Sequence, residues 1–218
     1  MKVKFEYKEM LANTGRAFYE KHFSPGFDSG DMSLRDMETG LIYVYPNVSE
    51  KKTFNNWSEL KPEDIAVVDI DGNYYETDNE ATVELPMHLA IYKARPETQV
   101  ILHSHPLWSS IYACCGKDIP LSLAEQAIFL GGRVLCAEYG PIGSKLLADN
   151  VVKALGTDKN AALLKNHGSV VIGKSINNVL TLSDFLEHGA QVAIFGQLLG
   201  GALEVERKDI FDPSLGME

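Results

Sequence analysis

Two histidines stand at the end of a short apolar segment in the middle of the chain. His103 and His105 follow the run Val100-Ile101-Leu102, whose aliphatic composition predicts a buried strand. Because side chains alternate along a strand, residues two apart point to the same side, with their Cα atoms about 6–7 Å apart. Two imidazoles in this arrangement can hold one metal ion through metal–nitrogen bonds of about 2.0–2.1 Å.

A third histidine follows a second apolar run. His167 comes shortly after residues 161–164, and Gly168 follows it at once. If these two apolar strands lie side by side, His167 meets His103 and His105. Three protein ligands with one open coordination position are typical of a catalytic metal site rather than a structural one. The alternative is that each histidine only caps its strand with ordinary hydrogen bonds.

An acidic residue opens a predicted helix over residues 84–95. Glu84 begins this helix. Its structural interpretation is a carboxylate that stabilises the helix by interacting with the helix dipole. The functional interpretation is a general base, or a fourth metal ligand that swings away. His88 lies one turn further on the same face and by spacing alone rivals His167 as the third ligand. We favour His167, because a histidine inside a helix more often packs or forms hydrogen bonds.

The remaining pattern predicts the elements that must position these side chains. Hairpins come first and strand–helix alternation later, which indicates a mixed sheet with helices packed on both faces. Apolar spacing and breaker residues place the elements as follows: helices at 6–22, 84–95, from Pro106 through Tyr112, 143–155 and 175–199, and strands at 32–35, 41–45, 65–68, 100–102, 134–136, 161–165 and 170–172.

Composition limits the classes of function. The 218 residues are 45% hydrophobic and 23% charged, which is ordinary for a globular chain, and we expect a single domain over 1–218. A net charge of −10 argues against a nucleic-acid or anionic-membrane partner. With no visible signal segment and three cysteines that cannot all pair, the expected location is cytoplasmic. The acidic tail 204–218 is expected to be mobile or to close a neighbour's site.

One segment matches a different motif. Residues 168–175 read G-x4-G-K-S, the pattern of a phosphate-binding loop between a strand and a helix. Such a loop must curl, whereas Val170-Val171-Ile172 is a stiff β-branched run that prefers an extended backbone. Ser175 is well explained as a helix N-cap. We therefore favour a strand, a turn and a helix start over a nucleotide-binding loop.

Taken in order, these motifs resemble the class II aldolase/adducin family. The likeness covers roughly residues 5–200 and implies a three-layer α/β/α sandwich with a mainly antiparallel sheet. It also implies one divalent ion per subunit, Zn²⁺ by its ligand types with Mn²⁺, Co²⁺ or Fe²⁺ as alternatives, and a homotetramer with sites between subunits. The segments that carry it are Glu84-x3-His88, His103-Ser104-His105, Asn166-His167-Gly168 and Gly30-Asp31-Met32-Ser33-Leu34-Arg35.

The resemblance implies a reaction and roles for the site residues. The ion would lie on His103, His105 and His167, and Glu84 would alternate between metal ligand and acid/base. The expected reaction is retro-aldol cleavage of a small hydroxy-carbonyl sugar or sugar phosphate through a metal-stabilised enediolate. An epimerase, dehydratase or decarboxylase is the alternative within the family. A non-catalytic adducin-like interaction domain is the alternative outside enzymes, and the retained glutamate and histidines argue against it.

The expected substrate-binding positions depart from the family pattern. The resemblance places them at Gly30, Asp31, Asn47 and Thr82. The family has Asn where this chain has Asp31, a Thr-Gly turn where it has Asn47-Val48, and a Ser-Ser pair where it has Thr82-Val83. A carboxylate repels a phosphate dianion, and a valine side chain offers no hydrogen-bond donor. We therefore predict a substrate without phosphate at this position, or one that binds its phosphate differently.

Overall fold

The computed structural model describes residues 2–24, 29–47, 56–76 and 79–210. The strands in this part of the chain are β1 Asp31–Arg35, β2 Ile42–Val44, β3 Ala66–Val68, β4 Val100–Ser104, β5 Cys136–Ala137, β6 Ala161–Leu164 and β7 Gly168–Gly173. They form one sheet in the order β3-β2-β1-β4-β7-β6-β5. Every neighbouring pair is antiparallel except β5–β6, which is parallel. The prediction of a mixed, mainly antiparallel sheet is therefore confirmed.

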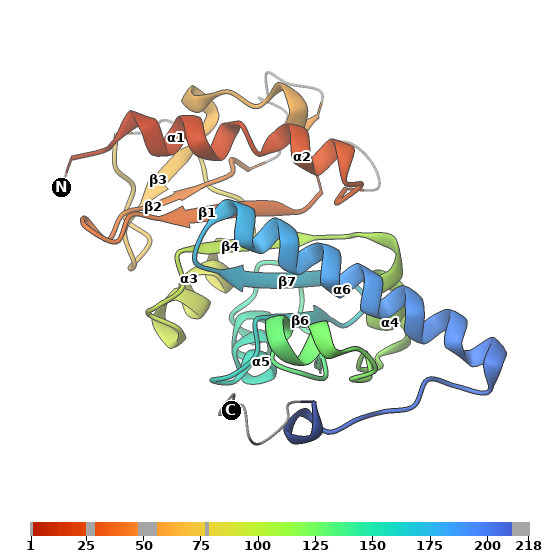
Figure 1. Cartoon of the computed structure of the whole chain (residues 1–218). Helices are drawn as coiled ribbons and strands as arrows, with labels where there is room; N and C mark the ends of the chain where they lie inside the picture. The colour runs from red at the N-terminus through yellow and green to blue at the C-terminus, as the bar shows by residue number, and fades with distance from the viewer. Residues whose placement is uncertain (1, 25–28, 48–55, 77–78, 211–218) are drawn as a thin grey trace.

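Helices cover both faces of this sheet (Figure 1). They are α1 Phe5–Ala12, α2 Gly15–Glu20, α3 Leu85–Ala94, α4 Leu107–Cys115, α5 Lys145–Leu155 and α6 Ile176–Gly196. Side chains of α1, α2 and α6 belong to one buried cluster with the sheet, and side chains of α3 and α5 belong to a second. The three-layer α/β/α arrangement is the one that the resemblance implies. No helix among the described residues is both long and apolar enough to cross a membrane.

The alternation of side chains in β4 explains why this strand lies at the centre. Val100 and Leu102 join the cluster on the α6 side, whereas Ile101 joins the cluster on the α3 and α5 side. All three are fully buried, as expected for a strand that is covered on both faces. The same alternation turns the next odd-numbered side chain, His103, toward the α3 face. The His103 side chain therefore lies on the face of the sheet that is covered by α3, the helix that Glu84 begins.

The predicted helix over residues 6–22 is wrong in one respect, because it is two helices. α1 ends at Ala12 and α2 begins at Gly15. The hydroxyl of Thr14 bonds to the Leu11 carbonyl and to the Tyr45 hydroxyl, both at 2.6 Å, at the junction. A Cβ at Gly15 would collide with the Trp57 carbonyl oxygen. Contacts from distant segments therefore break the helix, and its apolar spacing alone does not show them.

Most other predicted elements are confirmed, with small shifts at their ends. The strand expected at 134–136 forms at Cys136–Ala137, while Val134 only bridges to Ile119. The helix expected to reach residue 199 ends at Gly196 and continues as a single 3-10 turn. A π-helical segment over Gln126–Leu130 was not predicted. Residues 211–218 of the predicted tail lie outside the described residues.

The segment that matches a phosphate-binding loop is confirmed as a strand followed by a helix start. β7 pairs along both edges, with β4 on one side and β6 on the other, so its backbone amides are used in the hydrogen bonds of the sheet. Ser175 caps α6, because its hydroxyl accepts a hydrogen bond from the amide of Asn178. This segment is therefore not built to curl around a phosphate group.

Candidate active site

His167 reaches the other histidines through a strand that we did not expect between them. The run 161–164 does not lie side by side with β4, the condition under which we expected the histidines to meet, because β7 lies between β6 and β4. A turn joins β6 to β7, and Asn166 in this turn has a left-handed backbone with φ 58°. β7 then pairs antiparallel with β4, so that Val170 lies opposite His103. The start of β7 and the end of β4 therefore meet at the same end of the sheet.

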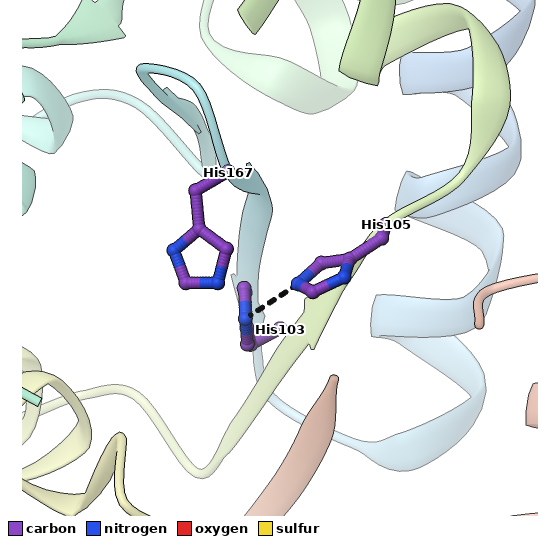
Figure 2. A group of neighbouring side chains, drawn as sticks. All are labelled: His103, His105 and His167. Atoms are coloured by element: carbon purple, nitrogen blue, oxygen red, sulfur yellow. Dashed lines mark hydrogen bonds between the residues drawn. The ribbon is translucent and has the colours of Figure 1, made fainter. Parts of the chain in front are cut away.

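The three imidazoles converge at this end of the sheet (Figure 2). The ring centroids lie 4.8 Å apart for His103 and His105, 4.7 Å for His103 and His167, and 4.9 Å for His105 and His167. One nitrogen from each ring lies within 4.8 Å of the other two. The predicted convergence of His103, His105 and His167 is confirmed, and the group could hold one metal ion.

Hydrogen bonding orients the most buried of the three rings. The Nδ1 atom of His103 lies 2.9 Å from the carbonyl oxygen of Ser169. Since a carbonyl oxygen only accepts, Nδ1 must carry the proton and donate. The Nε2 atom of His103 is then the free ligand atom, and it lies 3.0 Å from Nε2 of His105. A metal-binding histidine typically has such a partner, which fixes its tautomer and its ring orientation. The sequence gives no signal for this partner, because every residue carries a backbone carbonyl.

The surroundings keep all three rings uncharged. Burial lowers the pKa of His103 to about 4, of His105 to about 3 and of His167 to about 4, and repulsion from a neighbouring histidine acts in the same direction. The rings are therefore neutral near pH 7, the form in which imidazole binds a metal. Binding an ion there requires no displacement of protons from these groups.

Glu84 is a buried carboxyl group without hydrogen-bond partners. It is the N-cap residue of α3, only 3% of it is exposed, and neither carboxylate oxygen makes a hydrogen bond to the described residues. Burial raises the pKa of Glu84 to about 7, and the charge of Asp31 adds to this rise, while His88 and the nearby backbone of Gly143 act against it. Its oxygens lie outside the group of three histidines. An unpartnered buried carboxyl group is costly in a folded protein, which points to a ligand for it.

Two of the four predicted substrate-binding residues bond to each other. Oδ2 of Asp31 accepts a 2.6 Å hydrogen bond from the Thr82 hydroxyl, and Oδ1 lies 2.7 Å from Nε2 of His88. The expectation that His88 forms hydrogen bonds rather than joining the metal ligands agrees with this placement. Gly30 precedes Asp31 with φ 78°, and the amide of Asn47 donates to the Glu80 carbonyl at 2.8 Å. Val48, in the predicted turn, lies outside the described residues.

The crowding around residue 168 explains why a glycine follows His167. A Cβ at this position would collide with the His105 ring and would lie 2.5 Å from the Ser104 carbonyl oxygen. We expect the Gly168→Ala variant to push the His105 ring aside and to weaken zinc binding about 10–100-fold, as changes around metal ligands do. Competition with a chromophoric chelator measures this affinity.

The matched control for this change is Gly196→Ala at the end of α6. A Cβ there meets the nearest atoms only at 3.4 Å, an ordinary contact distance. Zinc affinity should remain at the wild-type value in this control. Equal zinc affinity in the Gly168→Ala variant would contradict the tight packing of His105 against β7.

Comparison with known proteins places the chain in a family. The family described as "Class II Aldolase and Adducin N-terminal domain" matches residues 9–194. The chain belongs to the class II aldolase and adducin family. The match spans α2 to α6 and includes Glu84 and the three histidines.

Individual relatives indicate the type of reaction. The chain is 30% identical over 179 residues to the 5-deoxy-D-ribulose 1-phosphate aldolase of Bacillus thuringiensis serovar kurstaki, covering 81% of this chain and 80% of the relative. It is 28% identical over 209 residues to the 3-oxo-tetronate 4-phosphate decarboxylase of Haemophilus influenzae, covering 93% of this chain and 95% of the relative. A solved L-fuculose 1-phosphate aldolase superposes with a TM-score of 0.87 at 27% identity, covering 95% of this chain and 94% of that one. The chain is an aldolase-type lyase.

Proposed function

We propose that this protein cleaves a small hydroxy-carbonyl sugar derivative by a retro-aldol reaction at a divalent ion held by His103, His105 and His167. One observation carries the proposal: three neutral imidazoles converge at one end of the sheet, and a buried carboxyl group without a hydrogen-bond partner in the described residues begins the helix α3, which packs on the face of β4 that carries Ile101. The three histidines present the nitrogen ligands that such an ion prefers, and three protein ligands leave the remaining coordination position for a substrate oxygen. Membership of the family supports the same reaction class.

Glu84 is the proposed proton carrier. A divalent ion bound here supplies Lewis-acid stabilisation of the negative charge that develops on substrate oxygens. A group whose pKa lies near the working pH can both take and return a proton, and the pKa of Glu84 is raised to about 7. Glu84 therefore holds the proton that the reaction releases and returns it to the carbon atom left by the broken bond. Its unpartnered oxygens also suit a fourth ligand that leaves the ion as substrate binds.

Zinc is the proposed ion. Imidazole ligands suit zinc, copper, iron and nickel, and a site with three histidines and one open position is typical of catalytic zinc. Manganese, cobalt and iron(II) are the alternatives. Elemental analysis of the purified protein, followed by reconstitution of the chelator-treated protein with each metal, identifies the ion that supports turnover.

The substrate is proposed to place no phosphate group against Asp31 and Thr82. The single hydroxyl proton of Thr82 is donated to Asp31, so it is not free for a ligand. Burial acts to raise the pKa of Asp31, but the charge and hydrogen bond of His88 outweigh it and hold this pKa at about 2. The carboxylate therefore stays anionic and would repel a phosphate. The two relatives are named for phosphorylated substrates, so a phosphate in this substrate would contact another part of the site.

A substrate panel tests the proposal. Purified protein is incubated with phosphorylated and unphosphorylated ketoses and sugar acids, and both aldehyde and carbon dioxide are measured with and without zinc. Metal-dependent release of an aldehyde supports the aldolase. Carbon dioxide release would favour the second candidate, a decarboxylase, which the Haemophilus influenzae relative supports. No bound metal and no turnover of any substrate would favour a non-catalytic, adducin-like role.

We also propose a homotetramer in the cytoplasm. Leu198, Leu199 and Leu203, after the end of α6, are 81%, 91% and 88% exposed, and such apolar exposure is typical of a surface that another copy covers. Light scattering of the purified protein tests the assembly, and a monomer mass would contradict it. Cys114, Cys115 and Cys136 are free thiols, which persist in a reducing compartment.

A further inference from the structure

Asp31 holds the chain on both sides of Glu84. One carboxylate oxygen accepts the Thr82 hydroxyl proton at 2.6 Å, two residues before Glu84. The other lies 2.7 Å from Nε2 of His88, one helical turn after Glu84. The amide of Glu84 in turn donates to the Thr82 oxygen at 3.2 Å. A single side chain on β1 therefore fixes both ends of the segment that carries the proposed proton carrier.

His88 is held from its other edge as well. Its Nδ1 atom lies 2.7 Å from the Ser33 hydroxyl oxygen, which lies 2.9 Å from the Tyr92 hydroxyl. The Tyr92 hydroxyl donates to the Gln99 carbonyl at 3.1 Å. His88 and Ser33 are fully buried, and Tyr92 is 1% exposed. With both ring nitrogens bonded, the imidazole cannot turn away from Asp31.

Asp31 is also tied to the strand that carries two of the histidines. In the antiparallel pairing of β1 with β4, Asp31 lies directly opposite His103, so the two side chains emerge on the same face. Gly30 brings the backbone close at this point, because a Cβ there would lie 2.7 Å from the His103 carbonyl oxygen. A rigid path of backbone pairing and short hydrogen bonds therefore connects Glu84 to His103.

We propose that Asp31, acting through Thr82 and His88, is a positioning residue that sets the place of the Glu84 carboxyl group relative to the three histidines. This inference rests on the proposed function, because it names Asp31 as the residue that positions Glu84, the proposed proton carrier. A carboxylate suits the task, since it accepts from the Thr82 hydroxyl and the His88 ring at once. Asp31 and Thr82 then serve Glu84 rather than touching substrate.

A matched pair of variants at Thr82 tests the inference. Thr82→Val keeps the side-chain shape but removes the hydroxyl that bonds to Asp31 and to the Glu84 amide. A displacement of about 1 Å at a reacting group can cost about 10²-fold in rate, so we expect kcat to fall at least about tenfold while KM changes less than about threefold. Thr82→Ser, which keeps the hydroxyl, should restore most of kcat. A raised KM with unchanged kcat in Thr82→Val would overturn the inference, because it would make Thr82 a substrate ligand.

A second buried aspartate controls for loss of stability alone. Asp36 follows β1 at its other end, is 1% exposed, and bonds to Lys4, Thr39 and the amide of Glu38. Asp36→Asn should lower the melting temperature without changing kcat, whereas Asp31→Asn should lower kcat. Equal effects of the two aspartate variants on kcat would mean that Asp31 acts only on stability.

Crystal structures of the zinc-loaded proteins separate this inference from the proposed function. Absence of metal-dependent cleavage by the wild type would count against the proposed function. The position of the Glu84 carboxyl group in the crystal structures would still show whether Asp31 positions it. Displacement of that group in Thr82→Val, with its wild-type position in Thr82→Ser, supports positioning by Asp31. An unmoved Glu84 in Thr82→Val overturns it.

Discussion

Replacing His105 with alanine is expected to remove zinc binding and turnover together while the fold stays intact. Loss of a hydrogen-bond partner around a metal ligand already costs about 10–100-fold in affinity, so loss of the ligand itself should cost more than about 100-fold. The Lewis-acid contribution of the ion is several kcal/mol, and about 4 kcal/mol corresponds to roughly 10³-fold in rate. Chelator competition measures the affinity, and initial rates at saturating zinc measure the turnover.

The control for this change is an exposed histidine on a helix. His188 lies on the surface of α6, outside the group of three histidines, and His188→Ala should bind zinc and react like the wild type. Circular dichroism of both variants checks that the sheet and helices are retained. Wild-type zinc affinity in a folded His105→Ala protein would show that the ion is bound elsewhere.

The second large effect is expected from Glu84→Gln, which should retain zinc and lose turnover. Glutamine has nearly the shape of glutamate but cannot carry a proton to and from a reacting carbon. Removal of a general acid–base group costs about 10²–10⁴-fold, and this loss should appear in kcat. Zinc affinity should change much less, because His103, His105 and His167 remain in place. Stopped-assay kinetics and chelator competition on the same preparation give both quantities.

An exposed glutamate provides the comparison for this variant. Glu20 pairs with Arg16 on the surface of α2, so Glu20→Gln removes a carboxylate that contributes little to the stability of the fold. It should leave both kcat and zinc affinity unchanged. A normal rate in Glu84→Gln would take Glu84 out of the mechanism, and a complete loss of zinc would make it a permanent ligand instead of a proton carrier.

The sequence predicted the layers of the fold well because the pattern of burial is local. The alternation of β4 side chains between the two buried clusters and the spacing of apolar residues in α3 and α5 follow directly from strand and helix geometry. The break between α1 and α2 depends instead on Tyr45 and Trp57, which are distant along the chain. Such contacts override local spacing, and no window of sequence around Thr14 contains them.

The site was predicted for its residues but not for the way they come together. His103, His105 and His167 were singled out because two of them stand two residues apart at the end of one apolar run and the third follows another. Their meeting depends on which strands are neighbours, and β7 lies between β4 and β6, an order that the sequence pattern did not predict. The bonds of Asp31 to Thr82 and His88 depend on how α3 packs on β1. Sequence spacing does not specify that packing.

The pairing of β4 with β7 links the proposed metal site to the correct alignment of these two strands. Two histidines belong to one of these strands and its end, the third immediately precedes the other, and Ser104 lies opposite Ser169. A slip of one residue between the strands would send the His103 ring to the opposite face of the sheet. Chains paired in the wrong alignment would then lack the proposed ion site. An ion that binds there would stabilise only correctly aligned molecules and shift a misaligned population toward them.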